Sequence, residues 1–466
     1  MIRKLIPLIG MSIFLYGCPP PAQYSRPALP VPSAWPESST AGAGAPGAPA
    51  AADLKWREFF ADQRLQSVIE LALASNRDLR VATLNIEKVQ ALYQIQRAEQ
   101  YPTIVASASA DAYRIPKSMS SKDHAETVAQ ITVGLGTASW ELDLFGRIRS
   151  LKTRALEQYL ATEQARSATQ IALVAAVANT YLMLAGDQEN LKLARETLDA
   201  QQASYELIRQ TRDAGIASDL DLRQAQSQVE VARVDIARYS GQVVLDENAL
   251  NLLVGAPVPA GMLSDELGGV AALKDVAPGL PSDVLLRRPD ILAAEHQLKA
   301  ASANIGAARA AFFPRITLTA AAGIMSSDLT NLFKPAAGTW NFAPQVVLPI
   351  FDSGARQANY KAAQVDRDIA IADYEKSIQA AFREVSDSLS LRTTLVAQQN
   401  ALQALVNALD ETYRLSEARY KEGIDSYLTV LVAQRSLYAA QQQMVGVRLA
   451  RLSNLVTLYK VLGGGA

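Results

Sequence analysis

The sequence contains very few residues that bind metals or form disulfides. Cys18 is the single cysteine in 466 residues, and His124 and His296 are the two histidines. One cysteine cannot form an internal disulfide, and two histidines so far apart in the sequence do not suggest a zinc site. We therefore expect no metal and no cofactor.

The chain also lacks an excess of either charge. Its formal net charge is −1, which argues against nucleic acid as a partner, because phosphate binding needs a concentrated basic face. GxSxG, HExxH and phosphate-loop motifs are missing too, so we do not expect an enzyme. No run of 18 or more apolar residues occurs, so we expect no transmembrane helix. An apolar fraction of 49% is nevertheless ample for a packed core.

The N-terminus has the features of a secretory signal. Arg3 and Lys4 precede an apolar stretch from Leu5 to Leu15, which is too short to span a bilayer. Leu15, Gly17 and Cys18 resemble a bacterial lipobox. We therefore predict a signal peptide over 1–17 and a covalent lipid on Cys18; an incidental cysteine is the alternative.

A tether follows the predicted lipid anchor. Pro19, rather than Asp, follows the cysteine, and this favours the outer membrane over retention in the inner membrane. Residues 18–52 are dominated by Pro, Ala, Gly and Ser, a composition that buries too little apolar surface to fold on its own. We expect an extended segment, which at about 3.1 Å per residue could reach roughly 105 Å.

The remainder of the chain reads as two copies of one pattern. RAEQYPTI at 97–104 matches RAAFFPRI at 309–316, an offset of 212. Farther along, the segments that begin at Tyr205 and Tyr413 match at an offset of 208, which also pairs Gly215 with Gly423. Ordered matches of this kind indicate an internal duplication and two structurally equivalent halves.

Each half contains a very long helical pattern. In the first, Val174 and Tyr181 belong to an apolar series with a spacing of seven, and no proline occurs from 145 to 212. About 68 residues of helix would be roughly 100 Å long. We predict long helical hairpins over 145–254 and 352–462, upstream helices over 53–102 and 286–314, and an equatorial segment over 255–285.

Two stretches, 103–144 and 315–351, alternate between apolar and other residues with a period of two. Each is typical of a hairpin of two strands. The apolar face of the first switches between Leu135 and Trp140, which predicts a β-bulge. Four strands of about 9 to 11 residues suit an outer-membrane β-barrel, with Trp340 and Phe342 near an aromatic girdle; a soluble sandwich is the alternative.

Four strands cannot close a barrel by themselves. An open strand edge in lipid would leave backbone groups without hydrogen bonds, which costs several kcal/mol for each group. The chain must therefore oligomerise if these strands span a membrane. Two, three or four protomers would satisfy this argument.

Essentially the whole predicted mature chain resembles a known family, and the resemblance is most specific in the C-terminal region. RYKEGIDSYLTVLVAQRSLYAAQQQ at 419–443, followed by LVTLYKVLGGG, is similar to the TolC-like outer membrane factors of the OprM/NodT type. The resemblance implies a fold that is mainly α with a transmembrane β part: a homotrimer with a periplasmic α-barrel and a shared twelve-stranded β-barrel. It implies an exit duct for drugs or other small toxic compounds. The implied partners are a periplasmic adaptor, an inner-membrane RND-type transporter and outer membrane lipid.

The same resemblance implies that the tips of the helical hairpins dock the adaptor. The docking residues it implies are Gly215, Ser218, Leu220, Gly423 and Ser426. Glycine also suits a left-handed turn, and serine suits a helix N-cap. The alternative is therefore that these residues only end and begin helices.

The resemblance further implies a periplasmic gate. Tyr420 and Asp221 would form a latch, Leu428 would plug the opening, and Arg435 would lie above it. Val432 stands, like Thr429, where family members often carry a pore-facing aspartate. We therefore expect a more hydrophobic constriction, which gates partly by dewetting.

Two other functions are also compatible with the sequence. A type I secretion exit duct would have a similar helical barrel. A non-channel coiled-coil periplasmic lipoprotein, an adaptor or scaffold, would also have long helices and a lipid anchor, but it would not need paired β-hairpins in both halves.

Overall fold

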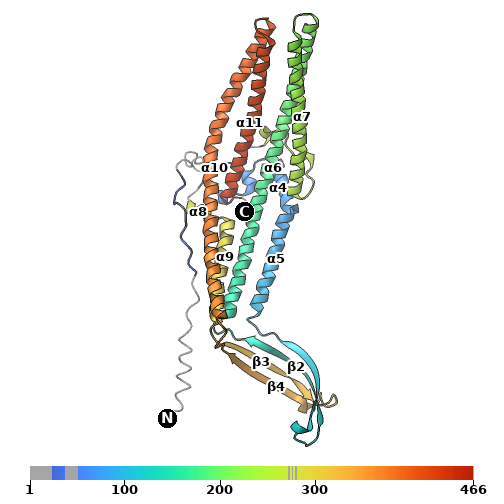
Figure 1. Cartoon of the computed structure of the whole chain (residues 1–466), viewed down its shortest axis with the longest axis vertical. Helices are drawn as coiled ribbons and strands as arrows, with labels where there is room; N and C mark the ends of the chain where they lie inside the picture. The colour runs from blue at the N-terminus through green and yellow to red at the C-terminus, as the bar shows by residue number, and fades with distance from the viewer. Residues whose placement is uncertain (1–23, 37–50, 271–272, 275, 279–280, 465–466) are drawn as a thin grey trace. The chain divides into compact units, whose positions relative to one another are not determined.

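The computed structural model describes residues 24–36, 51–270, 273–274, 276–278 and 281–464 (Figure 1). The predicted signal peptide and lipid anchor, 1–17 and Cys18, lie outside the described residues. The chain divides into two compact units. The first comprises Met1–Ala28, Ile86–Thr162 and Ala294–Tyr374, and the second comprises Leu29–Asn85, Glu163–Ala293 and Glu375–Ala466.

The helices follow the duplicated pattern. The first half contains α3 (Trp56–Phe59), α4 (Gln63–Ser75), α5 (Arg77–Ala98), α6 (Arg147–Asp213) and α7 (Asp219–Val254). After the 3-10 turns Ala260–Met262 and Leu267–Gly269, the second half contains α8 (Pro281–Leu285), α9 (Pro289–Ala310), α10 (Ala355–Lys421) and α11 (Tyr427–Val461). α6 and α10 each have 67 residues.

Aspartates at equivalent places start the two longest helices. The carboxylate of Asp143 accepts hydrogen bonds from the backbone N–H groups of Ile148 and Arg149. Asp352 accepts from the N–H group of Gly354, just before α10, and from that of Arg356 in the first turn of α10. Because the first N–H groups of a helix have no partner within the helix, these carboxylates fix where each helix begins.

The first unit contains one sheet of four antiparallel strands. β1 (Val105–Ile115), β2 (Glu126–Glu141), β3 (Arg315–Ser326) and β4 (Gly338–Val347) pair in the order β1-β2-β3-β4. The central pair, β2 and β3, joins the two repeats. β1 and β4 are the edge strands, and each has one outer edge without a partner strand in the described part of the chain.

The predicted bulge in β2 is confirmed. The pairing of β2 with β3 shifts register between Thr137 and Trp140, and Ser139 in this gap has a φ of 54°. An extra residue moves the following side chains to the other face of the sheet. This explains why the apolar face in the sequence switches at that place.

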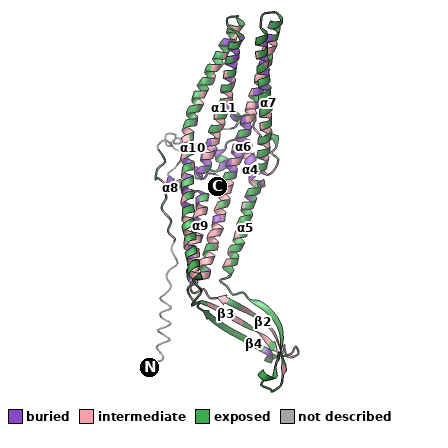
Figure 2. Cartoon of the chain, in the orientation of Figure 1, coloured by how far each residue is buried: buried purple, intermediate pink, exposed green. Residues whose placement is uncertain are grey.

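The sheet leaves large apolar side chains uncovered. Figure 2 shows exposed residues along much of its length. Trp340 and Phe342 of β4 are 77% and 61% exposed. An exposed surface of this kind indicates contact with a membrane or another protein.

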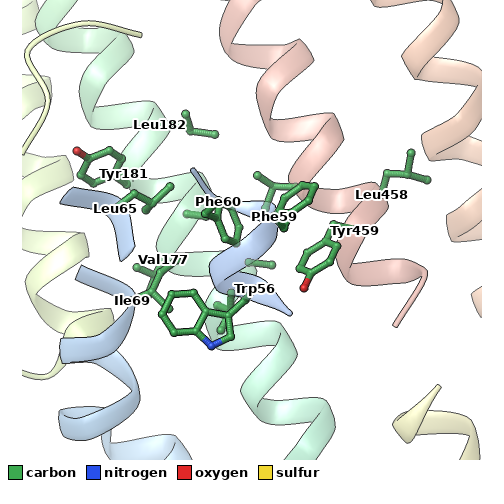
Figure 3. Close-up of a cluster of buried hydrophobic side chains, with 14 of the residues drawn as sticks. Trp56, Phe59, Phe60, Leu65, Ile69, Val177, Tyr181, Leu182, Leu458 and Tyr459 are labelled. Carbon is green, nitrogen blue, oxygen red and sulfur yellow. The ribbon is translucent and has the colours of Figure 1, made fainter. Parts of the chain in front are cut away.

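The second unit has an aromatic core (Figure 3). Phe59 stacks on Tyr459 with ring centroids 4.0 Å apart, and Phe60 meets Phe59 edge-on at 4.8 Å. The hydroxyl of Tyr459 donates to the carbonyl oxygen of Leu54. These contacts join α3, near the start of the described chain, to α11 at its end.

The apolar heptad series of α6 contributes to the same core. The members of the series that belong to this core are Val174, Ala178, Tyr181 and Ala185, and Ile171 is buried as well. Among the described helices, α6 is the one long and apolar enough to cross a membrane by composition, and 56% of its apolar window is buried within the protein. We therefore interpret α6 as a core helix.

The structure describes residues 24–36 and 51–52 of the predicted tether. The first stretch contains no helix or strand, and the second begins the short 3-10 helix Ala51–Asp53. The first stretch is nevertheless held by specific contacts. In the first unit, Tyr24 and Arg26 hydrogen-bond to the buried carboxylate of Glu295. In the second unit, Trp35 is buried and stacks on Phe382 at 4.9 Å. The predicted tether is therefore anchored against α10 at Trp35, rather than free along its whole length.

Candidate functional site at the helix tips

Both helical hairpins turn with the same backbone geometry. Gly215 and Gly423 have φ values of 78° and 70°, a left-handed conformation that favours glycine. The N–H of Gly215 bonds the carbonyl of Arg212, and the N–H of Gly423 bonds that of Tyr420. The prediction that the long helices reverse at these two glycines is confirmed.

The residue after each of these glycines is an exposed isoleucine that we did not predict as part of the site. Ile216 is 81% exposed and Ile424 is 62% exposed. Their positions are equivalent in the two repeats, with the same offset of 208. That repeated offset was the signal in the sequence that could have identified them.

The two predicted serine caps behave differently. Ser218 forms a capping box with Asp221: its hydroxyl oxygen accepts from the Asp221 N–H, and the Asp221 carboxylate accepts from the Ser218 N–H. Ser426 precedes α11 but makes no side-chain cap, so its predicted cap is wrong. The residue at the position equivalent to Asp221 is Thr429, whose side chain cannot complete a capping box.

An apolar cluster joins the two hairpins near their tips. Its buried members are Ile208, Leu222, Ala225, Tyr427, Val430 and Leu431. Tyr420 packs against this cluster, with its ring centroid 5.5 Å from that of Tyr427. Burial raises the pKa of Tyr427 to about 12. The tips of one protomer are therefore held together mainly by non-directional apolar contacts.

The two residues of the predicted latch lie near each other in this region. Burial, and then the negative charge of Asp221, raise the pKa of the Tyr420 hydroxyl. The Asp221 carboxylate oxygen accepts a hydrogen bond of 2.6 Å from the Ser218 hydroxyl. Within this protomer the Asp221 carboxylate therefore hydrogen-bonds to Ser218 rather than to Tyr420.

The other predicted gate residues share one face of α11. Leu428, Val432 and Arg435 are spaced by four and three residues and are exposed, as side chains on one helical face would be. Leu428 is 51% exposed and Val432 is 55% exposed. Leu220, one of the predicted docking residues, is 66% exposed on α7.

An ion pair in the second tip was not predicted. The guanidinium of Arg419 contacts the carboxylate of Asp425 at 2.6 Å across the turn at Gly423. Charged residues six apart carry no periodic signal, because only the turn brings them together. Among the described residues no cluster of three or more His, Cys, Asp or Glu side chains could hold a metal ion.

Two carboxyl groups meet farther from the tips, between α6 and α7. Asp246 is 4% exposed, and Asp187 lies in hydrogen-bonding contact with it. Burial, and then the contact with Asp246, raise the pKa of Asp187 to about 6. The folded protein therefore holds a proton at Asp187 that the unfolded chain, with a pKa of 3.8 at this group, releases at lower pH.

We predict that Asp187→Asn flattens the pH dependence of stability. A raised pKa in the folded state stabilises the fold below pH 4, and this contribution is lost as the pH rises through about 6. The amide resembles the protonated acid, so the variant should unfold at a higher temperature than the parent above pH 6. Thermal unfolding followed by circular dichroism between pH 4 and 7 measures this. The exposed Asp199 of the same helix provides the control, Asp199→Asn, and equal pH profiles for the two variants would contradict the prediction.

Comparison with known proteins identifies the class to which this architecture belongs. The family model described as "Outer membrane efflux protein" matches residues 68–256 and 280–464. The toluene efflux pump outer membrane protein TtgC and the antibiotic efflux pump outer membrane protein ArpC, both of Pseudomonas putida, are each 47% identical over 465 residues. Each alignment covers 100% of this chain and 96% of the relative.

A solved structure agrees with this result. The open state of the Neisseria gonorrhoeae MtrE outer membrane channel matches with a TM-score of 0.88 at 37% identity, over 96% of this chain and 98% of that one. The chain belongs to the outer membrane efflux protein family. The predicted fold class, mainly α with a transmembrane β part, is confirmed, as are the outer membrane location and the efflux channel function.

Proposed function

We propose that the protein is the passive exit duct of a tripartite efflux pump, gated at its periplasmic helix tips and without catalytic activity. One observation carries the proposal. A small sheet, whose two edge strands lack an outer partner in the part of the chain that the structure describes, exposes aromatic residues and connects in both repeats to helices of 67 residues. This arrangement suits a membrane-embedded sheet joined to a long helical conduit.

The open edges support a homotrimer. Within the described residues, β1 and β4 have no partner strand at their outer edges, and unpaired backbone groups are costly in lipid. Pairing β4 of each protomer with β1 of the next removes every edge. Three protomers of four strands would form a barrel of twelve, an even number as in bacterial outer membrane barrels.

At the closed gate, Tyr420 would donate a hydrogen bond to Asp221 in each protomer of the ring. Leu428 would close the opening, and Val432 would line it with apolar surface below Arg435. Because Thr429 and Val432 contribute no acidic ring, the constriction would exclude ions partly by dewetting. The capping box explains how Asp221 is held before the latch forms.

The tips would dock a periplasmic adaptor, which would connect the duct to an RND-type transporter in the inner membrane. Gly215, Gly423 and Leu220 are exposed at the tips, as are Ser218 and Ser426. An acyl chain on Cys18 would add a second attachment to the outer membrane. The relatives named for toluene and antibiotic efflux support small apolar toxic compounds and drugs as cargo.

Reconstitution in planar bilayers tests the proposal. The purified protein should migrate as a heat-modifiable trimer and conduct ions, with little block by cobalt or lanthanide ions. A strain without the gene should become sensitive to solvents and drugs. Recovery of a water-soluble monomer without conductance would contradict the proposed duct. Strong block by these cations would contradict the proposed apolar constriction but not the duct.

We predict that Tyr420→Phe raises the uptake of a large hydrophilic antibiotic such as vancomycin. The substitution keeps the ring in the apolar cluster and removes a hydrogen bond to a charged group, worth about 1.5 to 3 kcal/mol. Growth inhibition of cells that produce each variant measures the effect. Tyr413→Phe, a change of another tyrosine that packs on the same cluster, is the control. Equal uptake by the two variants would count against the latch.

A further inference from the structure

A second set of contacts joins the two hairpins, and it differs in kind from the apolar cluster at the tips. The hydroxyl of Tyr438 in α11 donates to the carboxylate of Asp235 in α7 at 3.0 Å. The amide of Gln442 donates to the hydroxyl of Tyr239 at 3.3 Å. The partners are four residues apart on each helix, so the two hydrogen bonds form successive rungs between helices that run in the same direction.

Arg238 completes this network, which we call the α7–α11 clamp (Asp235, Arg238, Tyr239, Tyr438 and Gln442). The guanidinium of Arg238 contacts the other carboxylate oxygen of Asp235 at 3.0 Å and lies 4.5 Å from the centre of the Tyr239 ring. The side chain of Asp235 is 13% exposed. Both oxygens of a largely buried carboxylate are therefore satisfied, one by each helix.

The Tyr438 hydroxyl is suited to remain a donor. Burial, and then the hydrogen bond to Asp235, raise its pKa above the ordinary value. The bond thus persists as a neutral donor on a charged acceptor across the physiological pH range. Hydrogen bonds of this class are directional and stronger than those between neutral groups.

The clamp lies well away from the tips. Asp235 follows Asp221 by 14 residues, which corresponds to roughly 21 Å along α7. Between them the hairpins meet through the apolar cluster of Leu222, Tyr427 and Val430. Apolar contacts have no preferred direction, so two helices can slide or rotate across them. The clamp, in contrast, fixes the distance between α7 and α11 and the register of one helix against the other.

We propose that Asp235 and Tyr438 are positioning residues for gating: the α7–α11 clamp is the pivot about which the tip of one hairpin swings away from the other. This inference depends on the proposed gate at the tips. Opening displaces the helix segments between the clamp and the turns, and the segments on the other side of the clamp keep their positions. When the clamp is lost, the tips can separate even when no periplasmic adaptor is bound.

Spin labels on either side of the clamp test the pivot directly. Leu428→Cys places a label 10 residues on the tip side of Tyr438, and Leu252→Cys places one 17 residues beyond Asp235; Leu252 is 81% exposed. Both labels are introduced into the full chain with Cys18→Ser, so that one thiol reacts. In the trimer, Tyr438→Phe should lengthen and broaden the distances between Leu428 labels and leave those between Leu252 labels unchanged.

Single-channel recording gives the functional readout. Tyr438→Phe should raise the open probability about tenfold, the change expected when one charge-assisted hydrogen bond is lost. Asp235→Asn should act in the same direction, because it removes the charge of the acceptor. The double variant should add little to Tyr438→Phe, because both changes act on the same hydrogen bond. Tyr459→Phe is the control, since it removes a buried tyrosine hydroxyl from the aromatic core and should leave the open probability unchanged.

The outcomes separate the pivot from the gate. If Tyr420→Phe opens the channel and Tyr438→Phe does not, the pivot is wrong and the gate stands. Equal displacement of the Leu428 and Leu252 labels would show general loosening and would also overturn the pivot. If neither the parent protein nor any variant conducts ions, the proposed duct function is contradicted. The distances between the labels still show whether the clamp controls the tips.

Discussion

Gly323→Val should prevent assembly of the trimer in the outer membrane. Gly323 of β3 lies opposite Gly134 of β2, in the strand pair that joins the two repeats. A Cβ atom at Gly323 would lie 2.6 Å from the Cα of Gly134 and would overlap the carbonyl oxygen of Val133. These are backbone atoms, so no side-chain rotation relieves the clash, and the central strands would have to separate.

Separation of β2 from β3 would leave backbone groups unpaired in lipid, at a cost of several kcal/mol for each group. We expect the amount of heat-modifiable trimer in outer membrane fractions to fall at least tenfold. Gly338→Val is the matched control on β4, because a Cβ there meets its nearest atom at 3.9 Å. Equal amounts of trimer for the two variants would show that the sheet tolerates the added side chain.

The parts of the fold that follow from local pattern could be predicted from the sequence. The seven-residue spacing that includes Val174 and Tyr181 identified a buried helix face. The change of apolar face before Trp140 identified the bulge. Gly215 and Gly423 identified the turns, because a left-handed residue at the end of a helix favours glycine wherever it occurs. In each case the physical cause lies within a few residues of the pattern.

Contacts between distant segments could not be predicted in this way. The hydroxyl of Tyr459 reaches a carbonyl 405 residues away in the sequence, and Tyr438 reaches Asp235 across 203 residues. Neither pair has a spacing that marks it. The predicted cap at Ser426 was wrong for a related reason. A serine before a helix predicts a cap, but the capping box at Ser218 also includes the carboxylate of Asp221, three residues later, and the second repeat has Thr429 at that position.

The same limit applies to the candidate site. The resemblance to known channels identified the tip residues, and the structure places Leu428, Val432 and Arg435 together on one exposed helix face. The sequence does not indicate that Asp221 forms a capping box with Ser218. It also does not indicate that the α7–α11 clamp lies about four turns farther along α7. Residues that control movement between two hairpins carry no local signal, because their role arises from the packing of one hairpin on the other.

Phe59→Ala should strongly destabilise the second unit. Phe59 has no exposed surface, stacks on Tyr459 with an interplanar angle of 5°, and meets Phe60 edge-on. Truncation of a buried phenylalanine costs about 3 to 5 kcal/mol, because apolar contacts are lost and a cavity remains.

The same substitution also loosens the contact between α3 and α11. We therefore expect the unfolding temperature of the purified protein, followed by circular dichroism, to fall by many degrees. Phe59→Leu, which keeps most of the volume, should lose less. Phe333→Ala removes a phenylalanine that is 79% exposed and should leave the unfolding temperature within about a degree of the parent, since surface changes are usually worth less than about 0.5 kcal/mol. Equal unfolding temperatures for Phe59→Ala and Phe333→Ala would show that the aromatic core does not stabilise the contact between α3 and α11. The stability of the helical hairpins would then come from the apolar contacts between their own helices.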